Sequence, residues 1–517
     1  MKYSIAILIS FLLLRGVAAQ DNSAGKQLNI LFIAIDDLKP VFKSYGSSVT
    51  ITPNFDKLSE TATVFTGAYC QQAVCAPTRA SLLTGLRPDK TKVWDLKTLI
   101  RDKNPDIVTL PQYFKMNGYR TIGMGKIFDQ RSVDKEADSV SWSVPYKKKF
   151  TYAAGYEEPA FGMYQDPTIR EKEKAGVKLG SGDDAVSEAK KPTECMDVPD
   201  DAYTDGAMAN FAVSRLKELK NGNKPFFLAV GFRKPHLPFI APKKYWDLYD
   251  RNKIELATWQ KKSINGPDIA FHNSGELRSY ADIKSVNNTS DLLILEDSKQ
   301  RELIHGYYAA ISYIDAQVGK LLDALKENGL DKNTIVVIWG DHGWHLGDHS
   351  LWNKHSNFEQ ATHVPLFIKV PGVINGKKYS HPAEFVDIFP TLCDLTGLKT
   401  PSDLDGVSLL PALKGSDIPV KAFAISQYPR ASKSGSRDVM GYSLRGMQYR
   451  FTEWVDQFIS TEKIFNPKDL LAIELYDLAN DPNETINLAS DPKMKTIVEN
   501  LSQQLHEYYA QQYKTRR

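Results

Sequence analysis

The sequence predicts an α/β fold with a mostly parallel sheet. Three continuous apolar runs, LNILFIAI at 28–35, PFFLAV at 225–230 and TIVVIW at 334–339, have the length of strands and no alternating polar positions. Strands of this kind are buried on both faces, as in parallel sheets that helices cover. Residues 304–328 carry apolar side chains at helical spacing, which predicts one such amphipathic helix.

Each of the three predicted strands ends in polar residues. Asp36-Asp37 follow the first run, Arg233–His236 come shortly after the second, and Asp341-His342 follow the third. Open α/β sheets bind ligands at the carboxyl ends of their strands. We therefore expect the active site at this edge of the sheet.

The pattern changes near Asp438. Residues 440–454 and 472–478 alternate like antiparallel strands, and residues 494–513 have the pattern of a helix. The sequence therefore predicts a catalytic domain over residues 25–435 and a smaller α+β subdomain, with an antiparallel sheet and a helix, over residues 436–517.

The first residues have the pattern of a secretory signal peptide, predicted at residues 1–19. A positive start at Met1-Lys2 precedes an apolar run at 3–14 and a small-residue exit at 17–19. The run is too short to span a bilayer comfortably, and no later segment is apolar for long enough. We expect a secreted or periplasmic protein without stable membrane insertion.

Composition excludes some functions. The 517 residues carry a net charge of +3, too little to suggest nucleic-acid binding from bulk charge. The four cysteines include no C-x-x-C pair, which argues against a structural zinc site. Oligomeric state is not readable from the sequence.

The most informative motif is Cys75-Ala76-Pro77-Thr78-Arg79, followed by Leu-Thr-Gly at 83–85. Alone, a C-x-P segment also fits a turn with a small buried thiol. With the rest of the motif, the segment resembles the signature of type I sulfatases. In that family a maturation enzyme oxidises the cysteine to formylglycine. One hydroxyl of the hydrated aldehyde attacks sulfur, and the other then expels sulfate.

The aspartates at the strand ends form a candidate cation site. Adjacent carboxylates such as Asp36 and Asp37 repel one another when they are partly buried, unless a cation is present, although a D-D pair also fits a turn or a helix cap. Oxygen-rich sites favour Ca²⁺, or Mg²⁺, over zinc. The resemblance implies one calcium ion, held by Asp36, Asp37, Cys75 as formylglycine, Asp341 and His342.

Four basic residues also occupy family positions, although each alone fits a surface cation. They are Arg79, Lys126 in G-M-G-K, His236 in K-P-H and Lys354 in W-N-K. The resemblance implies that Arg79 polarises the nucleophile and that Lys126 and Lys354 hold the sulfate oxygens. It implies that His236 protonates the departing sugar oxygen.

Longer matches, from about residue 29 to about residue 487, resemble the iduronate-2-sulfatase group of this family. They include QQAVCAP, PFFLAVGFRKPHLPF and VDIFPTL. The resemblance implies an alkaline-phosphatase-like α/β fold and hydrolysis of sulfate esters on saccharides. We expect exo action on sulfated, uronate-containing oligosaccharides from polysaccharide breakdown, with Arg233 or Lys234 pairing with the sugar carboxylate.

One position departs from the family pattern. A histidine commonly follows the G-K lysine, and this chain has Asp129 there. A carboxylate can accept a proton from the diol, but it donates one only if its pKa is raised.

Two other functions stay open at this point. A phosphodiesterase or phosphatase of the alkaline-phosphatase superfamily normally has a second metal where this chain has Arg79, Lys126 and Lys354. An inactive carbohydrate-binding relative is disfavoured because the nucleophile, the cation ligands and the lysines are all present.

Overall fold

A computed structural model describes residues 27–178, 190–283, 292–373, 376–431, 439–456 and 466–514. The predicted signal peptide at residues 1–19 lies outside the described residues. None of the helices in these ranges is long and apolar enough to cross a membrane. The four cysteines carry free thiols.

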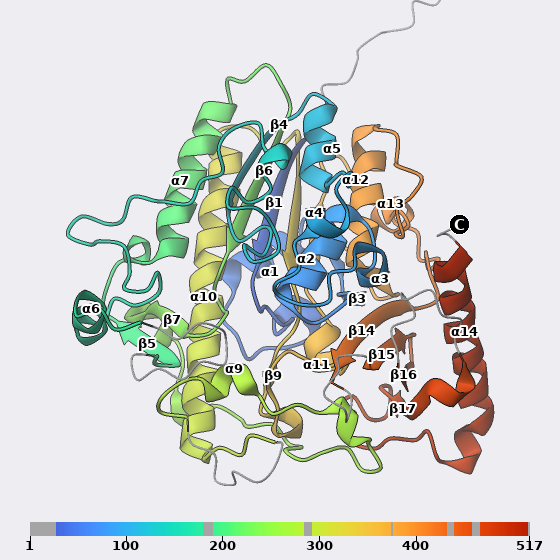
Figure 1. The fold of residues 1–517 in the computed structure, drawn as a ribbon. Coiled ribbons are helices and arrows are strands. Elements are labelled where there is room, and N and C mark those ends of the chain that lie inside the picture. The colour runs from blue at the N-terminus through green and yellow to red at the C-terminus, as the bar shows by residue number, and fades with distance from the viewer. Residues whose placement is uncertain are drawn as a thin grey trace, which may run out of the picture.

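The largest sheet has seven strands in the order β12-β2-β11-β8-β1-β6-β4 (Figure 1). Strands β8, β1, β6 and β4 run parallel, and β11 is antiparallel to β8 and β2. The three predicted strands are neighbours in this sheet, so the mostly parallel arrangement is confirmed. The strands are β1 (Asn29–Ile35), β2 (Thr63–Phe65), β4 (Arg120–Gly125), β6 (Phe226–Phe232), β8 (Thr334–Gly340), β11 (Leu366–Lys369) and β12 (Lys378–Tyr379).

Helices cover both faces of this sheet (Figure 1). Strand β1 shows why: Leu31 and Ile33 belong to one core cluster, and Ile30 and Phe32 belong to the other. Each such side chain contributes roughly 1.5–3 kcal/mol when it leaves water. On the first face lie α1 (Pro53–Ser59), α7 (Thr204–Leu219) and α10 (Asp297–Glu327), and on the second lie α2 (Cys75–Thr84), α5 (Leu110–Met116) and α12 (Ile388–Thr396).

A second, antiparallel sheet of four strands lies in the C-terminal part of the chain. It consists of β14 (Ala424–Arg430), β15 (Val439–Arg445), β16 (Tyr449–Val455) and β17 (Leu470–Asp477), and α14 (Lys495–Lys514) packs on it. The antiparallel strands and the final helix are as predicted. Strand β14 was not predicted, and it lies before the expected boundary at 435/436, which stays a prediction. Proline has no N–H to donate to a neighbouring strand, and Pro429 is tolerated because β14 lies at the edge of the sheet.

Shorter elements connect these layers. The small strand pairs are β3 (Ala68–Tyr69) with β13 (Ala383–Glu384), β5 (Thr193–Met196) with β7 (Phe239–Pro242), and β9 (His345–Leu346) with β10 (Trp352–Asn353). The short helices are α3 (Pro88–Thr91), α4 (Ile100–Lys103), α6 (Pro167–Lys174), α8 (Lys243–Trp246), α9 (Gly275–Arg278), α11 (Glu359–Thr362) and α13 (Leu410–Leu413).

Candidate active site

The ends of β1 and β8 bring three aspartates together. Because these strands are adjacent and parallel, Ile35 pairs with Gly340 and the residues that follow them meet at one edge. The Asp37 N–H donates to Asp341 Oδ1 at 2.9 Å, and the Asp341 N–H donates to the Ile35 carbonyl at 3.1 Å. Asp36, Asp37 and Asp341 are all buried.

A left-handed turn lets both aspartates of the D-D pair serve one site. Asp37 has a φ of +58°, a conformation that costs a non-glycine residue on the order of 1–3 kcal/mol. The buried Tyr307 of α10 donates a hydrogen bond to the Asp37 carbonyl at 2.6 Å, and its hydroxyl accepts one from the Lys39 N–H. Helix α10 therefore stabilises the turn that aims Asp37.

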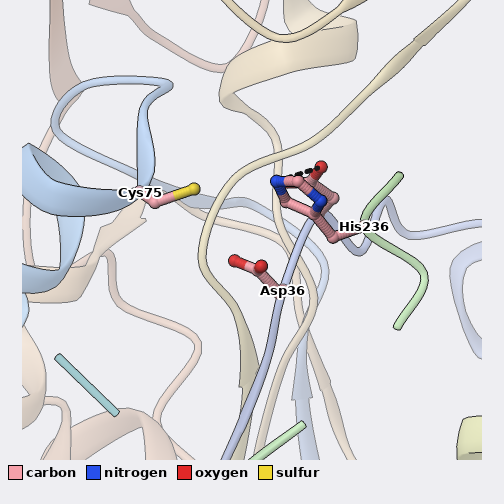
Figure 2. A group of neighbouring side chains, drawn as sticks. Asp36, Cys75 and His236 are labelled. Atoms are coloured by element: carbon pink, nitrogen blue, oxygen red, sulfur yellow. Dashed lines mark ion pairs between the residues drawn. The ribbon is translucent and has the colours of Figure 1, made fainter. Parts of the chain in front are cut away.

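Cys75 is the first residue of helix α2 and is 1% exposed. Its Sγ lies 3.4 Å from His342 Nε2. Figure 2 shows the side chains of Asp36, Cys75 and His236 converging on one space. Burial and the nearby Asp36 charge raise the pKa of the Cys75 thiol well above its ordinary value. The encoded cysteine is therefore protonated and poorly nucleophilic.

Arg79 lies one helical turn after Cys75 and is fully buried. Its Nη2 lies 3.0 Å from Asp36 Oδ1, and its Nε lies 2.9 Å from Asp341 Oδ2. Its Nη1 donates to the carbonyls of Lys126 and Ile127. All three nitrogens of the guanidinium are thus bonded to protein oxygens, and the group holds carboxylates in place.

Two glycines let Lys126 approach the aspartates. Gly125 has a φ of +74°, and a Cβ there would lie 2.1 Å from the Gly231 carbonyl oxygen, while a Cβ on Gly231 would collide with the Lys126 backbone. Strands β4 and β6 can therefore approach closely at their ends. Lys126 Nζ lies 2.6 Å from Asp36 Oδ2.

Lys354 and His236 approach from the other side of the aspartates. Lys354 Nζ lies 3.2 Å from Asp37 Oδ2, and His236 Nε2 lies 3.8 Å from the same oxygen. Both side chains also contact Glu276: Oε2 is 2.8 Å from Lys354 Nζ, and Oε1 is 3.2 Å from His236 Nε2.

Glu276 was not predicted from the sequence. It lies in a stretch without regular periodicity, FHNSGELR, and a lone glutamate there carries no motif. Its carboxylate is nevertheless buried, with its side chain 7% exposed. Only the folding of the 264–283 segment over the strand ends brings it to the site.

The donor set fits a hard divalent cation. Ligand atoms of Asp36, Asp37, Cys75 and His236 lie within 4.8 Å of one another, and so do those of Cys75, Asp341 and His342. The predicted ligands are thus brought together, and His236 joins them. Burial, together with the charges of neighbouring carboxylates, raises the pKa of Asp37 well above its ordinary value and that of Asp341 to about 6. A bound cation would offset this excess of buried negative charge.

A cavity of about 300 Å³ opens beside these residues. Lys126, His236 and Asp36 reach it from the strand ends, and Arg233 and Lys234 line its wall. The wall also includes Asp129, Gln130, Arg131, Gly162, Met163, Tyr203, Thr204, Asp205, Leu237, Ile240 and Tyr313.

The two basic residues of the cavity wall differ in what they can bind. Lys234 Nζ donates to the carbonyls of His236 and Pro238, and burial lowers its pKa to about 8. The backbone of both residues is held by the buried Asp205 carboxylate. The guanidinium of Arg233 is exposed and makes no hydrogen bond or ion pair within the described residues, so it is available to a ligand.

Asp129 is an ionised carboxylate. Burial opposes its ionisation, but hydrogen bonds from Arg131 and the charge of Lys126 outweigh burial and lower its pKa to about 2. The sequence left open whether this residue donates a proton. With this pKa it accepts hydrogen bonds and donates none.

Comparison with protein families gives two matches. Residues 28–398 match the model described as sulfatase. Residues 347–511 match the model described as the C-terminal part of N-sulphoglucosamine sulphohydrolase. Together these cover most of the described chain, including the four-stranded sheet.

Individual proteins show the same likeness. Iduronate 2-sulfatase of Mus musculus is 34% identical over 97% of this chain and 98% of its own length. A solved 2-O GAG sulfatase superposes with a TM-score of 0.62 at 22% identity, covering 94% of this chain and 92% of its own. The phosphonate monoester hydrolase of Agrobacterium radiobacter superposes with a TM-score of 0.69 at 22% identity, with 94% and 96% covered. The expected alkaline-phosphatase-like α/β fold is confirmed.

Proposed function

The chain belongs to the sulfatase family and is a sulfuric ester hydrolase, and from this premise we propose its mechanism and substrate. It is a formylglycine-dependent enzyme that removes O-sulfate from terminal residues of sulfated, uronate-containing saccharides. The observation that supports this most is the state of Cys75, which is buried among carboxylates and has a raised pKa. A thiol there is a poor nucleophile, whereas the hydrated aldehyde made from it supplies a nucleophilic hydroxyl.

The basic side chains of the site bind and orient the ester. Lys126 lines the cavity and lies beside Asp36, where its charge offsets that of sulfate oxygens in the transition state. Lys354 lies beside Asp37, and its charge likewise offsets that of the sulfate oxygens. His236, with a quarter of its side chain exposed, donates the proton to the departing sugar oxygen. Arg79 positions the carboxylates and does not contact sulfate.

We propose one calcium ion for the carboxylate cluster. Asp36, Asp37, Asp341, His342 and residue 75 would hold it. When bound, the ion supplies positive charge next to the sulfate oxygens and the nucleophile. The hard oxygen donors of this set suit calcium better than zinc.

The cavity wall favours an acidic sugar. Arg233 lies on the same loop as His236, and its guanidinium has no hydrogen bond or ion pair in the part of the chain that the structure describes. A carboxylate beside the scissile sulfate can form two parallel hydrogen bonds with it. Lys234 is bonded to backbone carbonyls and is the weaker candidate. The similarity to iduronate 2-sulfatase, at 34% identity over 97% of this chain, supports a uronate 2-O-sulfate.

The proposal includes modification of Cys75 by a maturation enzyme and export from the cytoplasm. The C-x-P-x-R motif is the segment that a formylglycine-generating enzyme would recognise in the unfolded chain. The predicted leader at residues 1–19 supports export to the periplasm or the medium, where sulfated polysaccharide is degraded. The boundaries at 25–435 and 436–517 remain part of this proposal.

One experiment tests the chemistry directly. The protein is co-expressed with a maturation enzyme, and the peptide that contains residue 75 is examined by mass spectrometry for the aldehyde or its hydrate. Activity is measured on the sulfate and phosphate esters of one chromogenic alcohol. We expect the modification, a clear preference for sulfate, and no activity in Cys75→Ala protein. Full activity of that variant would refute the formylglycine mechanism.

The same assay addresses the alternatives. The likeness to a phosphonate monoester hydrolase shows the shared fold alone, because the identity is 22%. Preference for the phosphate ester would favour the phosphodiesterase or phosphatase function. No turnover of any sulfated saccharide by fully modified protein would favour an inactive carbohydrate-binding relative.

A further inference from the structure

A second cavity lies apart from the active site. Its volume is about 640 Å³, within the range of roughly 300–1,000 Å³ that small-molecule sites occupy. Its wall is formed by parts of two segments, 39–51 after β1 and 248–259 after α8, together with Ile304 and Tyr308 of α10. No described residue lines both this cavity and the active-site cavity. The second cavity is therefore a separate place at which a ligand can bind.

Lys39 gives the second cavity a cation that lacks a carboxylate partner. Its Nζ donates to the neutral amide of Gln360, at 2.6 Å from Oε1, and it forms no ion pair within the described residues. The nearby Asp348 carboxylate is already bonded to His345 and to the Leu346 N–H. The Lys39 side chain is half-buried, and an ammonium in such a place is stabilised by an anion. An anionic group of a ligand would supply that partner.

The remaining charges of the wall are exposed to solvent. Asp250 and Lys253 lie 3.8 Å apart, with side chains 49% and 85% exposed, and Glu255 is exposed as well. Water and salt screen exposed charges, and a loose surface pair contributes little. These residues therefore leave Lys39 as the cation that an anionic ligand would contact inside the cavity.

Aromatic and apolar side chains form much of the rest of the wall. The rings of Tyr249 and Tyr308 lie 5.8 Å apart, and the Trp259 ring is held by the Lys261 ammonium, 4.3 Å from its centroid. Aromatic faces of this kind pack against the C–H groups of a sugar ring. Large apolar side chains that are partly exposed mark ligand sites when they gather in one place. Three line this cavity with about two-fifths of their surface exposed: Val49, Ile51 and Leu248.

Two polar groups on these aromatic residues lack hydrogen-bond partners. The Trp259 indole N–H is buried and has no acceptor within the described residues. The Tyr308 hydroxyl likewise makes no hydrogen bond in the part of the chain that the structure describes. Buried donors are normally satisfied. Sugar hydroxyl groups both donate and accept, so a bound saccharide would satisfy both side chains.

We propose that the second cavity is a non-catalytic binding site for an acidic saccharide. The sulfate or carboxylate group of one sugar residue pairs with Lys39, and the sugar ring packs on Tyr308 and Trp259. The choice of a saccharide rests on the proposed function, because an enzyme that acts on sulfated saccharides meets such ligands together with its substrate. No bond is made or broken at this site.

Binding without turnover tests the inference. Cys75→Ala protein with calcium is titrated in a calorimeter with a sulfated uronate disaccharide. We expect two sites per chain, and the loss of one when Lys39→Met is added, because methionine fills similar space without the charge. The affinity of that site should fall at least tenfold, the effect of losing a charged hydrogen-bond partner. Lys43→Met, at an exposed lysine of the same segment that does not line the cavity, is the matched control and should keep both sites.

A second variant examines the sugar contact. Trp259→Phe keeps a ring but removes the unpartnered N–H, and should weaken the second site roughly three- to tenfold. Thermal unfolding checks that each variant is folded, and crystals soaked with the disaccharide locate both bound molecules. We expect an anionic group of one of them beside Lys39 Nζ.

Two results would overturn the inference. One is that Lys39→Met changes neither the number of sites nor any affinity. The other is that inorganic sulfate binds the second site as tightly as the disaccharide does, which would leave an anion site without sugar recognition. Failure of the proposed function looks different: the matured protein would hydrolyse no sulfate ester, while a site that Lys39→Met removes would still be found in the titration.

Discussion

Arg79 Nε lies 2.9 Å from Asp341 Oδ2, and neither side chain is exposed to solvent. The contact joins the first turns of helix α2, which carries residue 75, to the end of strand β8. The second arm of the guanidinium bonds Asp36 at the end of β1. One side chain therefore sets the distance between the nucleophile position and two carboxylates of the candidate cation site.

Replacing Arg79 with lysine tests this arrangement. Lysine keeps the charge but lacks the planar fork, so it cannot bond both aspartates and two carbonyls. We expect the free energy of unfolding to fall by about 3 kcal/mol because buried carboxylates lose a partner, and kcat to fall at least 100-fold. Urea unfolding and sulfate-ester turnover measure the two effects. Arg215→Lys, at an exposed pair on α7, is the control. Unchanged stability and turnover would contradict the positioning role.

Removing the cation should abolish turnover. We expect elemental analysis to find one calcium ion per chain, and a chelator to lower both the unfolding temperature and the activity, with recovery when calcium is added back. Asp341→Ala should lose both the metal and turnover, because the site loses a ligand and Arg79 loses a partner. Asp247→Asn, at a surface ion pair, should keep both. Two tightly bound zinc ions per chain would argue for the phosphatase function.

Arg233 should determine the preference for acidic sugars. We expect Arg233→Ala to raise KM for a sulfated uronate disaccharide about 30-fold, the loss of roughly 2 kcal/mol from a charged hydrogen-bond pair, with kcat little changed. KM for a neutral sulfated sugar should change less than threefold. Lys253→Ala, at a lysine that is 85% exposed, is the control. Equal effects on acidic and neutral sugars would show that Arg233 does not recognise the carboxylate.

A buried ion cluster between the two sheets should make stability depend on pH. The Glu384 carboxylate forms ion pairs with Arg87 and Lys421, and its Oε1 accepts a hydrogen bond from the Ile425 N–H of β14. Burial opposes ionisation, but the charges of Arg87 and Lys421 outweigh it and lower the Glu384 pKa from 4.5 to about 2. A lowered folded-state pKa stabilises the protein above the unfolded-state pKa. That contribution is lost as the pH falls from about 4.5 through about 2.

The variant Glu384→Gln checks this pH window. At pH 7 it should be less stable by about 3 kcal/mol, since Arg87 and Lys421 are left with an uncharged partner. The difference from the unaltered protein should shrink as the pH is lowered towards 3, because Glu384 becomes protonated in the unfolded state while it is still ionised in the folded protein. Urea unfolding at pH 7, 5 and 3 gives the comparison, with Glu302→Gln as control. A difference that stays constant with pH would exclude the mechanism.

Much of the site could be predicted because its residues follow strands or lie in a spaced motif. Asp36, Asp37, Asp341 and His342 follow apolar runs whose burial in a parallel sheet is evident from their composition, and the C-x-P-x-R motif is local in sequence. The position of Lys126 depends on Gly125 and Gly231. The sequence shows both glycines, but their role in the close approach of two strand ends follows only from the pairing of β4 with β6. Strand β14 was missed because its residues, AISQYPR, do not alternate regularly between apolar and polar and include a proline.

The sequence by itself determined three of the buried strands, the residues at their ends and the motif around Cys75. These are local properties, set by side-chain burial and by spacing along one helix turn. Only the tertiary structure decided that the guanidinium of Arg79 is bonded entirely to protein oxygens and that Lys234 is bonded to carbonyls, while the Arg233 side chain has no partner among the described residues. It also decided that Glu276 contacts His236. The reason is that an ion pair depends on the distance between segments far apart in the chain. That distance is set by how the layers pack.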